Sequence, residues 1–235
     1  MTGFWSSLSD ALGLILAGDA ALWAIIGLSL QVSLSAVALA CLIGLPLGAL
    51  VGAFRFPGRG AVCVILNALM GLPPVVVGLL VYLMLSASGP LGPLALLYTP
   101  TAMMIAQTIL VTPIVAALTR QIVEDLNAEY CEHFASMGVT GSGRIAALLW
   151  DARFSLMTVA LAGFGRAVAE VGAVIIVGGN INHVTRVMTT TIALETSKGN
   201  LELALALGVV LLVIAVVVNG LVMALRASAV RAAYA

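Results

Sequence analysis

Residues 129–153 read EYCEHFASMGVTGSGRIAALLWDAR. Charged side chains recur along this stretch, in a chain in which only 9% of the residues are charged. Long apolar runs flank it on both sides. A polar segment of this length between apolar runs is predicted to be a loop outside the membrane, and the runs beside it are predicted to be membrane spans.

The composition is that of a polytopic membrane protein. Hydrophobic residues make up 62% of the 235 residues, and the mean hydropathy is +1.19. Soluble domains are about half apolar and about a quarter charged, so a soluble globular fold is excluded. Long continuous apolar runs are typical of helices and unlike the alternating strands of a barrel. We therefore predict an all-α bundle of transmembrane helices.

The apolar runs predict about five spanning helices, each needing roughly 20 residues. The mixed segment at residues 1–20 is predicted to lie along the interface as an amphipathic helix, with a further span as the alternative. A transmembrane domain is predicted at 21–228, with a cytoplasmic loop at 119–153, and a short tail follows at 229–235. The spans are placed at about 22–54, 61–86, 97–118, 154–178 and 203–225.

Basic residues predict the orientation. If residues 129–153 face the cytoplasm, the turn at 55–60 and the C-terminal tail face it too. Arg186 and Lys198 then lie outside, and Arg166 lies within a span. The basic residues on the cytoplasmic side are Arg55, Arg59, Arg120, Arg144, Arg153, Arg226 and Arg231. Cytoplasmic loops are enriched in Lys and Arg, so the N-terminus is predicted outside and the C-terminus in the cytoplasm.

Small and helix-breaking residues mark the first two spans. Gly44, Gly48 and Gly52 follow one another at four-residue steps, which allows close approach of another helix, either within the chain or in a second subunit. Pro73 and Pro74 lack backbone N–H donors and predict a kink or break. That break is either a fixed bend for packing or a pore-lining element of a translocation path.

Two charged residues lie one turn apart in the fourth predicted span. Arg166 and Glu170 are expected to pair on one helix face, because isolated charges are costly inside a bilayer. The pair either stabilises helix packing or lines an anion path. Beyond this span, Asn180, Thr189 and Thr190 are expected at the outer mouth of a pathway, where their polar groups can hydrogen-bond a passing anion. An ordinary loop that docks another protein is the alternative.

The sequence lacks the motifs of catalysis and metal binding. It contains no GxxxxGK[ST] phosphate loop, HExxH, paired CxxC or GxSxG. Cys41, Cys63 and Cys131 show neither disulfide nor metal spacing. No catalytic residue, metal, cofactor or nucleic-acid partner is predicted for this chain.

The polar stretch resembles the cytoplasmic coupling motif of binding-protein-dependent ABC importer permeases. That family pattern is Glu-Ala-Ala, three residues, Gly, nine residues and Ile-x-Leu-Pro. Glu132 takes the acidic position and Gly138 the glycine, while His133 and Phe134 replace the two alanines. The Ile, Leu and Pro positions hold Leu148, Trp150 and Asp151. The match is therefore degraded, because the terminal proline is missing.

More of the chain, over about residues 25–225, is similar to oxyanion importer permeases. GRAVAEVGAVIIVGGNI at 165–181 looks like the corresponding segment of molybdate, tungstate and sulfate permeases. MGLPPVVVGLLVYLMLSASGPLG at 70–92 and HVTRVMTTTIALETSKGN at 183–200 are most similar to the tungstate type. The resemblance implies a type I ABC importer permease fold and import of a tetrahedral oxyanion, most closely tungstate, with molybdate or sulfate as alternatives.

The resemblance also implies partners and a location. Two copies of the chain would form the pathway within membrane lipid, ABC ATPase subunits would dock from the cytoplasm, and an extracytoplasmic binding protein would deliver the anion. The chain would lie in the cytoplasmic (inner) membrane of a prokaryote and would not itself be an enzyme. The ATPase-coupling residues would be Glu129, Glu132, Phe134 and Gly138.

A short helix over 128–138 is predicted for this contact. Its carboxylates would lie near its start, Gly138 would end it, and Ser142 would cap the next helix.

Two other functions remain open from the residues alone. In a secondary transporter or channel, the proline break and the Arg166–Glu170 pair would form a gate and an ion-coupling site. The second alternative function is that of a scaffold protein in a membrane complex, which transports nothing.

Overall fold

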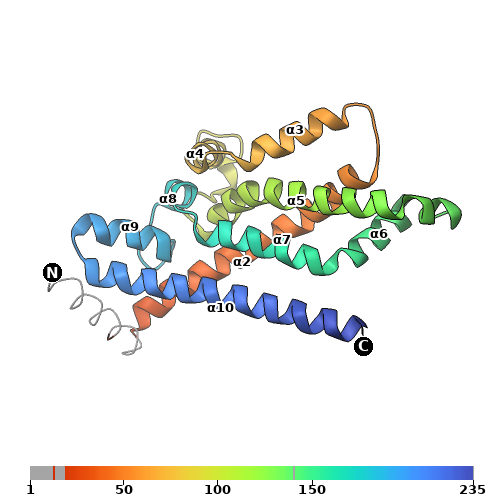
Figure 1. Ribbon diagram of the computed structural model, residues 1–235. Helices are drawn as coiled ribbons and strands as arrows, with labels where there is room; N and C mark the ends of the chain where they lie inside the picture. The colour runs from red at the N-terminus through yellow and green to blue at the C-terminus, as the bar shows by residue number, and fades with distance from the viewer. Residues whose placement is uncertain (1–12, 14–18, 140, 235) are drawn as a thin grey trace. The chain divides into compact units, whose positions relative to one another are not determined.

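The computed structural model describes Gly13 and residues 19–139 and 141–234, with side chains as far as Ala224. Helices and loops make up this part of the chain, and no strand occurs in it. The predicted all-α class is therefore confirmed, and Figure 1 shows the helices in chain order. The predicted amphipathic segment at 1–20 lies almost wholly outside the described residues.

Three helices in the described ranges are long and apolar enough to cross a membrane. They are α2 (Ala20–Ala53), α5 (Pro100–Ser136) and the first part of α10 (Leu201–Tyr234). The number is up to five if each of two bent pairs forms one span: α3 (Arg59–Met70) with α4 (Pro74–Leu85), and α6 (Gly141–Asp151) with α7 (Arg153–Val168). The shorter elements are η1 (Gly92–Leu94), α8 (Gly172–Gly178) and α9 (Met188–Lys198).

The adjacent prolines separate α3 from α4. Pro73 has an extended backbone (φ −64°, ψ 122°), and Pro74 is the first residue of α4. A residue that precedes proline avoids the helical region, whereas proline is well suited to the first helical position. The two helices meet at 98°. The predicted break is confirmed, and the second predicted span is not a single straight rod.

The fourth predicted span is not a continuous helix. α7 ends at Val168 and α8 begins at Gly172. The backbone N–H of Ala173 donates to Oε1 of Glu170 at 3.0 Å, so this carboxylate binds the first turn of α8. The prediction of one helix over 154–178 is wrong. The assumption that Arg166 and Glu170 share one helix face therefore has no basis, since Glu170 lies after the end of α7.

The chain forms two compact units, each assembled from three separate stretches. Of the described residues, the first unit comprises those up to Ser35, Pro73–Gln107 and Ala167–Val218, and the second comprises Ala36–Leu72, Thr108–Arg166 and those from Asn219 onward. Leu22, Ile26, Met188, Ala206 and Leu207 form a core cluster in the first unit.

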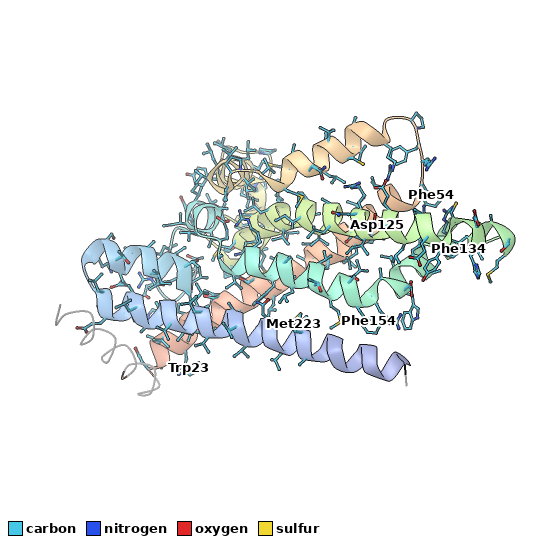
Figure 2. The ribbon with its side chains drawn as sticks, in the orientation of Figure 1. Trp23, Phe54, Asp125, Phe134, Phe154 and Met223 are labelled. Carbon is cyan, nitrogen blue, oxygen red and sulfur yellow. The ribbon has the colours of Figure 1, made fainter. Side chains whose placement is uncertain are left out.

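The core cluster of the second unit joins α2, α5 and α6. It comprises Ala49, Ala53, Val123 and Leu148. Phe54 and Phe134, both labelled in Figure 2, pack against it from the ends of α2 and α5. The cluster thus holds α6 beside the C-terminal part of α5.

The glycine stripe of α2 lies against α5 within the second unit. A Cβ atom added at Gly48 would lie 2.7 Å from Cβ of Thr119, and one added at Gly52 would lie 2.7 Å from the carbonyl oxygen of Arg120. At Gly44 the added atom would lie 2.9 Å from Val115. Only glycine permits this helix approach, so the interpretation of the stripe as packing within one chain is confirmed.

Candidate functional site

Residues 129–153, here called the coupling segment after the motif that they resemble, begin inside the last turns of α5. This helix ends at Ser136, and Gly138 has the left-handed backbone conformation (φ +64°). The N–H of Gly138 donates to the carbonyl of Ala135 at 3.3 Å, and the N–H of Val139 donates to that of Phe134 at 3.0 Å. This pair of bonds is a Schellman motif. Gly138 therefore ends a helix, as its sequence position predicted.

Two local predictions for the coupling segment are wrong. No separate helix starts near 128, because nothing in residues 114–136 stops a helix: the stretch has no glycine or proline. Glu129 and Glu132 consequently lie near the C-terminal end of a long helix, where the helix dipole does not favour carboxylates. Ser142 lies inside α6, which begins one residue earlier at Gly141, and so does not precede that helix as a cap.

Phe134 is held against the protein. Its ring is half-buried and meets the ring of Tyr130 edge-on, with the centroids 6.1 Å apart. The guanidinium of Arg144 covers it at 5.6 Å from the ring centroid. A cation–π contact of this kind stabilises by about 0.5–1 kcal/mol at an exposed site. Phe134 therefore links the end of α5 to α6.

The exposed side chains of the coupling segment are both acidic and apolar. Glu129 and Glu132 are exposed, and the large apolar side chains of Met137 and Trp150 are 68% and 72% exposed. Exposed apolar groups beside carboxylates are a typical docking surface for another protein. Sequence reasoning missed Met137, which stands in a polar loop next to the glycine and could have been noticed there.

A buried polar cluster lies in the first unit. It comprises Ser29, Ser33, Gln107, Glu170 and Thr189, which are all at most 8% exposed. Oγ of Ser29 accepts from the N–H of Met188 at 2.7 Å. Oγ1 of Thr189 donates to the carbonyl of Glu170 at 2.8 Å. These bonds connect α2 and α9 to the break between α7 and α8.

A small cavity of about 10 Å³ lies at this cluster. Nε2 of Gln107 donates to the carbonyl of Ala167 at 3.0 Å, while its Oε1 is buried and has no hydrogen-bond partner among the described residues. A polar cavity of this size holds about one water molecule. Sequence reasoning missed Ser29, Ser33 and Gln107, although polar side chains inside apolar runs are the expected signal of such a place.

The residues predicted for a translocation path fall into both units. Arg166 belongs to the second unit, whereas the other six, namely Pro73, Pro74, Glu170, Asn180, Thr189 and Thr190, belong to the first. Oγ1 of Thr190 donates to Oδ1 of Asn180 at 3.0 Å, and both Thr189 and Thr190 are buried. Their hydroxyls thus bind other parts of the protein in this conformation.

The end of α9 carries a buried carboxylate. Oε1 of Glu195 accepts from Nζ of Lys198 at 2.9 Å, and Oε2 accepts from Nδ2 of Asn200 at 3.0 Å. The hydrogen bond from Lys198 holds the pKa of Glu195 below its ordinary range, and Asn200 contributes in the same direction. Glu195 therefore links the last turn of α9 to Asn200, the residue that precedes α10.

Comparisons with known proteins agree with this architecture. The family model of the binding-protein-dependent transport system inner membrane component matches residues 44–230. A probable anion ABC transporter permease protein of Haloferax volcanii is 42% identical over 202 residues, which cover 84% of this chain and 87% of the relative. The tungstate uptake system permease protein TupB of Peptoclostridium acidaminophilum is 39% identical over 216 residues, or 92% and 95% of the two chains. A sulfate transport system permease protein, CysW of Synechocystis, is 26% identical over 211 residues, or 85% and 75%.

Proposed function

The chain belongs to the binding-protein-dependent transport system inner membrane components, and from this membership we propose that it is the permease subunit of an ABC importer for a tetrahedral oxyanion, with tungstate as the preferred substrate. ATP hydrolysis would take place on a separate ATPase subunit. The observation that supports the substrate best is the similarity to a tungstate permease over nearly the whole length of both chains.

The preference for tungstate over sulfate follows from sequence identity, which is higher to the tungstate permease than to the sulfate permease. Identity is 39% to the tungstate permease and 26% to the sulfate permease. Molybdate remains the nearest alternative, because molybdate and tungstate share charge and tetrahedral shape. An extracytoplasmic binding protein would make most of this distinction, since tight binding inside the permease would slow release.

The coupling segment would receive the movement of the ATPase. Its exposed carboxylates at Glu129 and Glu132 and its exposed apolar side chains offer a docking surface. The Schellman motif at Gly138 and the Arg144–Phe134 contact would join this surface to α6 and so to α7. A segment connected in this way can pass on a rigid-body displacement.

The pathway itself would run past the buried polar cluster between two copies of the chain. The cavity beside Gln107 holds about one water molecule, so the described conformation is closed to an oxyanion at this place. Opening would have to break the bonds of Thr189 and Ser29 to their neighbours. Arg166, as the basic residue predicted for the path, would then be the group that meets the anion.

Reconstituted transport tests the proposal. The chain is incorporated into liposomes with the candidate ATPase and binding protein of the same organism, and uptake of tungstate, molybdate and sulfate is measured by mass spectrometry of the metal or by radioactive sulfate. We expect ATP-dependent tungstate uptake that stops when the ATPase is inactivated. Uptake driven by an ion gradient without any ATPase, or uptake of sulfate alone, would contradict the proposal.

The proposed orientation has its own test. Cys131 is the exposed cysteine and lies in the coupling segment, whereas Cys41 and Cys63 are half-buried. In intact cells that carry the Cys41→Ser and Cys63→Ser variant, a membrane-impermeant maleimide is expected to leave Cys131 unlabelled until the membrane is opened. Labelling from outside would place the coupling segment on the wrong side for an ATPase.

A further inference from the structure

A second polar site is present in the second unit and shares no residue with the buried polar cluster. It is a pocket of about 770 Å³ formed where the end of α2, the start of α3, the C-terminal part of α5 and α6 meet. Its volume is within the range of about 300–1,000 Å³ that is typical of small-molecule sites. The charged and polar residues that line it are Arg55, Arg59, Glu124, Asn127 and Arg144.

The one lining carboxylate is already shared between two arginines. Oε1 of Glu124 lies 2.8 Å from the guanidinium of Arg59, and Oε2 lies 2.8 Å from that of Arg120. Nε of Arg59 also donates to the carbonyl of Val51 at 2.8 Å. Because Arg59 and Arg120 already share this carboxylate, Glu124 is not free to neutralise the other arginines of the pocket.

The other two lining arginines have no carboxylate partner among the described residues. Nε of Arg144 donates to Oδ1 of Asn127 at 2.6 Å, and its guanidinium lies over the ring of Phe134. These contacts hold Arg144 in place without neutralising its charge. Arg55 is exposed and has no hydrogen bond or ion pair in the described structure. The pocket therefore presents guanidinium groups whose charge is uncompensated.

We propose that this pocket binds a phosphate-type tetrahedral oxyanion, carried either by the headgroup of an anionic phospholipid or by a free dianion. The guanidinium group matches the oxygens of such an anion in a two-pronged geometry. In the proposed orientation, on which this part of the inference rests, the pocket lies at the cytoplasmic ends of its helices, where a basic pocket meets a leaflet rich in anionic lipid. The pocket has room for a phospholipid headgroup as well as for a free anion. This site is separate from the proposed transport path, and binding to it does not depend on transport.

Cys131 lines the same pocket and provides a reporter. The full-length chain with Cys41→Ser and Cys63→Ser is placed in nanodiscs, and the rate of Cys131 labelling by an uncharged maleimide is measured. One arm uses neutral phosphatidylcholine and adds inorganic phosphate, with chloride at equal ionic strength as the control. The second arm replaces part of the lipid with phosphatidylglycerol. We expect at least about threefold slower labelling in one arm, and the arm that responds identifies the source of the anion.

Two opposite substitutions sharpen the test. Arg55→Gln removes an uncompensated charge and is expected to weaken binding about tenfold, whereas Glu124→Gln removes the only lining carboxylate and is expected to strengthen it. Arg55 is exposed and without a partner, so its substitution leaves the packing intact. Arg153→Gln is the matched control, since Arg153 lies over Trp150 and Phe154 outside the pocket. Absence of protection in both arms, or protection that Arg55→Gln leaves unchanged, would overturn the proposal.

Discussion

The guanidinium of Arg59 and the carboxylate of Glu124 lie 2.8 Å apart, so an ion pair ties the first turn of α3 to α5. The two side chains are 23% and 40% exposed, and exposed pairs contribute up to about 1 kcal/mol. We expect Glu124→Gln to lower the melting temperature by about 2–4 °C, measured by thermal unfolding in nanodiscs. Asp125→Asn at the neighbouring exposed position is the control, and an equal loss there would contradict a specific role for Glu124.

The contact between Gly48 and α5 predicts a loss of stability on addition of one methyl group. In Gly48→Ala the new Cβ would lie 2.7 Å from Thr119 and would force α2 away from α5, at a cost of about 1–3 kcal/mol. Gly27→Ala in the same helix has nothing within 4 Å and should leave stability unchanged or raise it slightly. Thermal unfolding of both variants in nanodiscs measures the difference. If the two behave alike, helix packing at Gly48 is looser than described.

Gly138 is expected to be essential for coupling because of its backbone conformation. Its φ of +64° strains any other residue, and Gly138→Val adds a β-branched side chain at the turn between α5 and α6. Uptake driven by ATP should fall at least about tenfold in proteoliposomes while membrane insertion persists. Gly143→Val is the control, since it lies in the same segment inside α6 with a φ that other residues adopt. Normal transport by Gly138→Val would contradict the assignment.

The charge of Glu132 gives a second measure of coupling that leaves the backbone unchanged. Glu132 is exposed, so Glu132→Lys should not affect folding. We expect the variant to lose ATP-driven uptake because it reverses the charge that we propose to face the ATPase. Measuring ATPase stimulation in the assembled transporter checks this directly, and unchanged stimulation would remove Glu132 from the docking surface.

Glu170 is predicted to act on stability through its hydrogen bond to the first turn of α8. Glu170→Ala removes the acceptor of the Ala173 N–H and should cost about 1 kcal/mol, which is typical for loss of a side chain that caps a helix. Glu170→Gln keeps an oxygen at the same position and should retain most of this stability. Thermal unfolding of the pair separates the hydrogen bond from the charge. Equal losses would show that the charge itself is what matters.

The depressed pKa of Glu195 predicts a pH dependence of stability. An unfolded glutamate has a pKa of about 4.3, and in the folded protein the hydrogen bond from Lys198 lowers the pKa of Glu195. The ionised form therefore stabilises the fold above about pH 4.3, and this contribution is lost as the pH falls through the lower, folded pKa. Wild type should exceed Glu195→Gln in melting temperature at pH 7, and the gap should shrink towards pH 3. Glu202→Gln, an exposed position in α10, should show no such trend.

The fold could be predicted largely from hydropathy, and the errors share one cause. Apolar run length located the helices α2, α5 and α10, and the adjacent prolines located the break before α4. Run length does not report where a helix stops inside an apolar stretch. α7 ends at Val168 and α8 begins at Gly172, where the Glu170 carboxylate accepts from the N–H of Ala173, a local contact that run length does not detect.

Features of the candidate sites could be predicted where a residue type has one strong conformational preference, such as glycine at the end of a helix. Gly138 ends α5 as a glycine of that position should, whereas the start of a helix near 128 was wrong, because the carboxylates there also suit the interior of a helix. Gln107 and Ser29 were missed because each is a single polar residue in an apolar run. The Arg55, Arg59 and Arg144 pocket depends on three distant stretches of chain meeting, and only the folded structure brings them together.

The right-angled junction of α3 and α4 bears on how this part of the chain fits its lipid. Each of the two helices has 12 residues and is about 18 Å long, against a hydrocarbon layer of about 30 Å. A straight rod of their combined length would specify one bilayer thickness. Two rods of 12 residues each, separated at the adjacent prolines, do not specify one length in this way. The proline break thus removes from this stretch the single long rod whose length a bilayer would have to match.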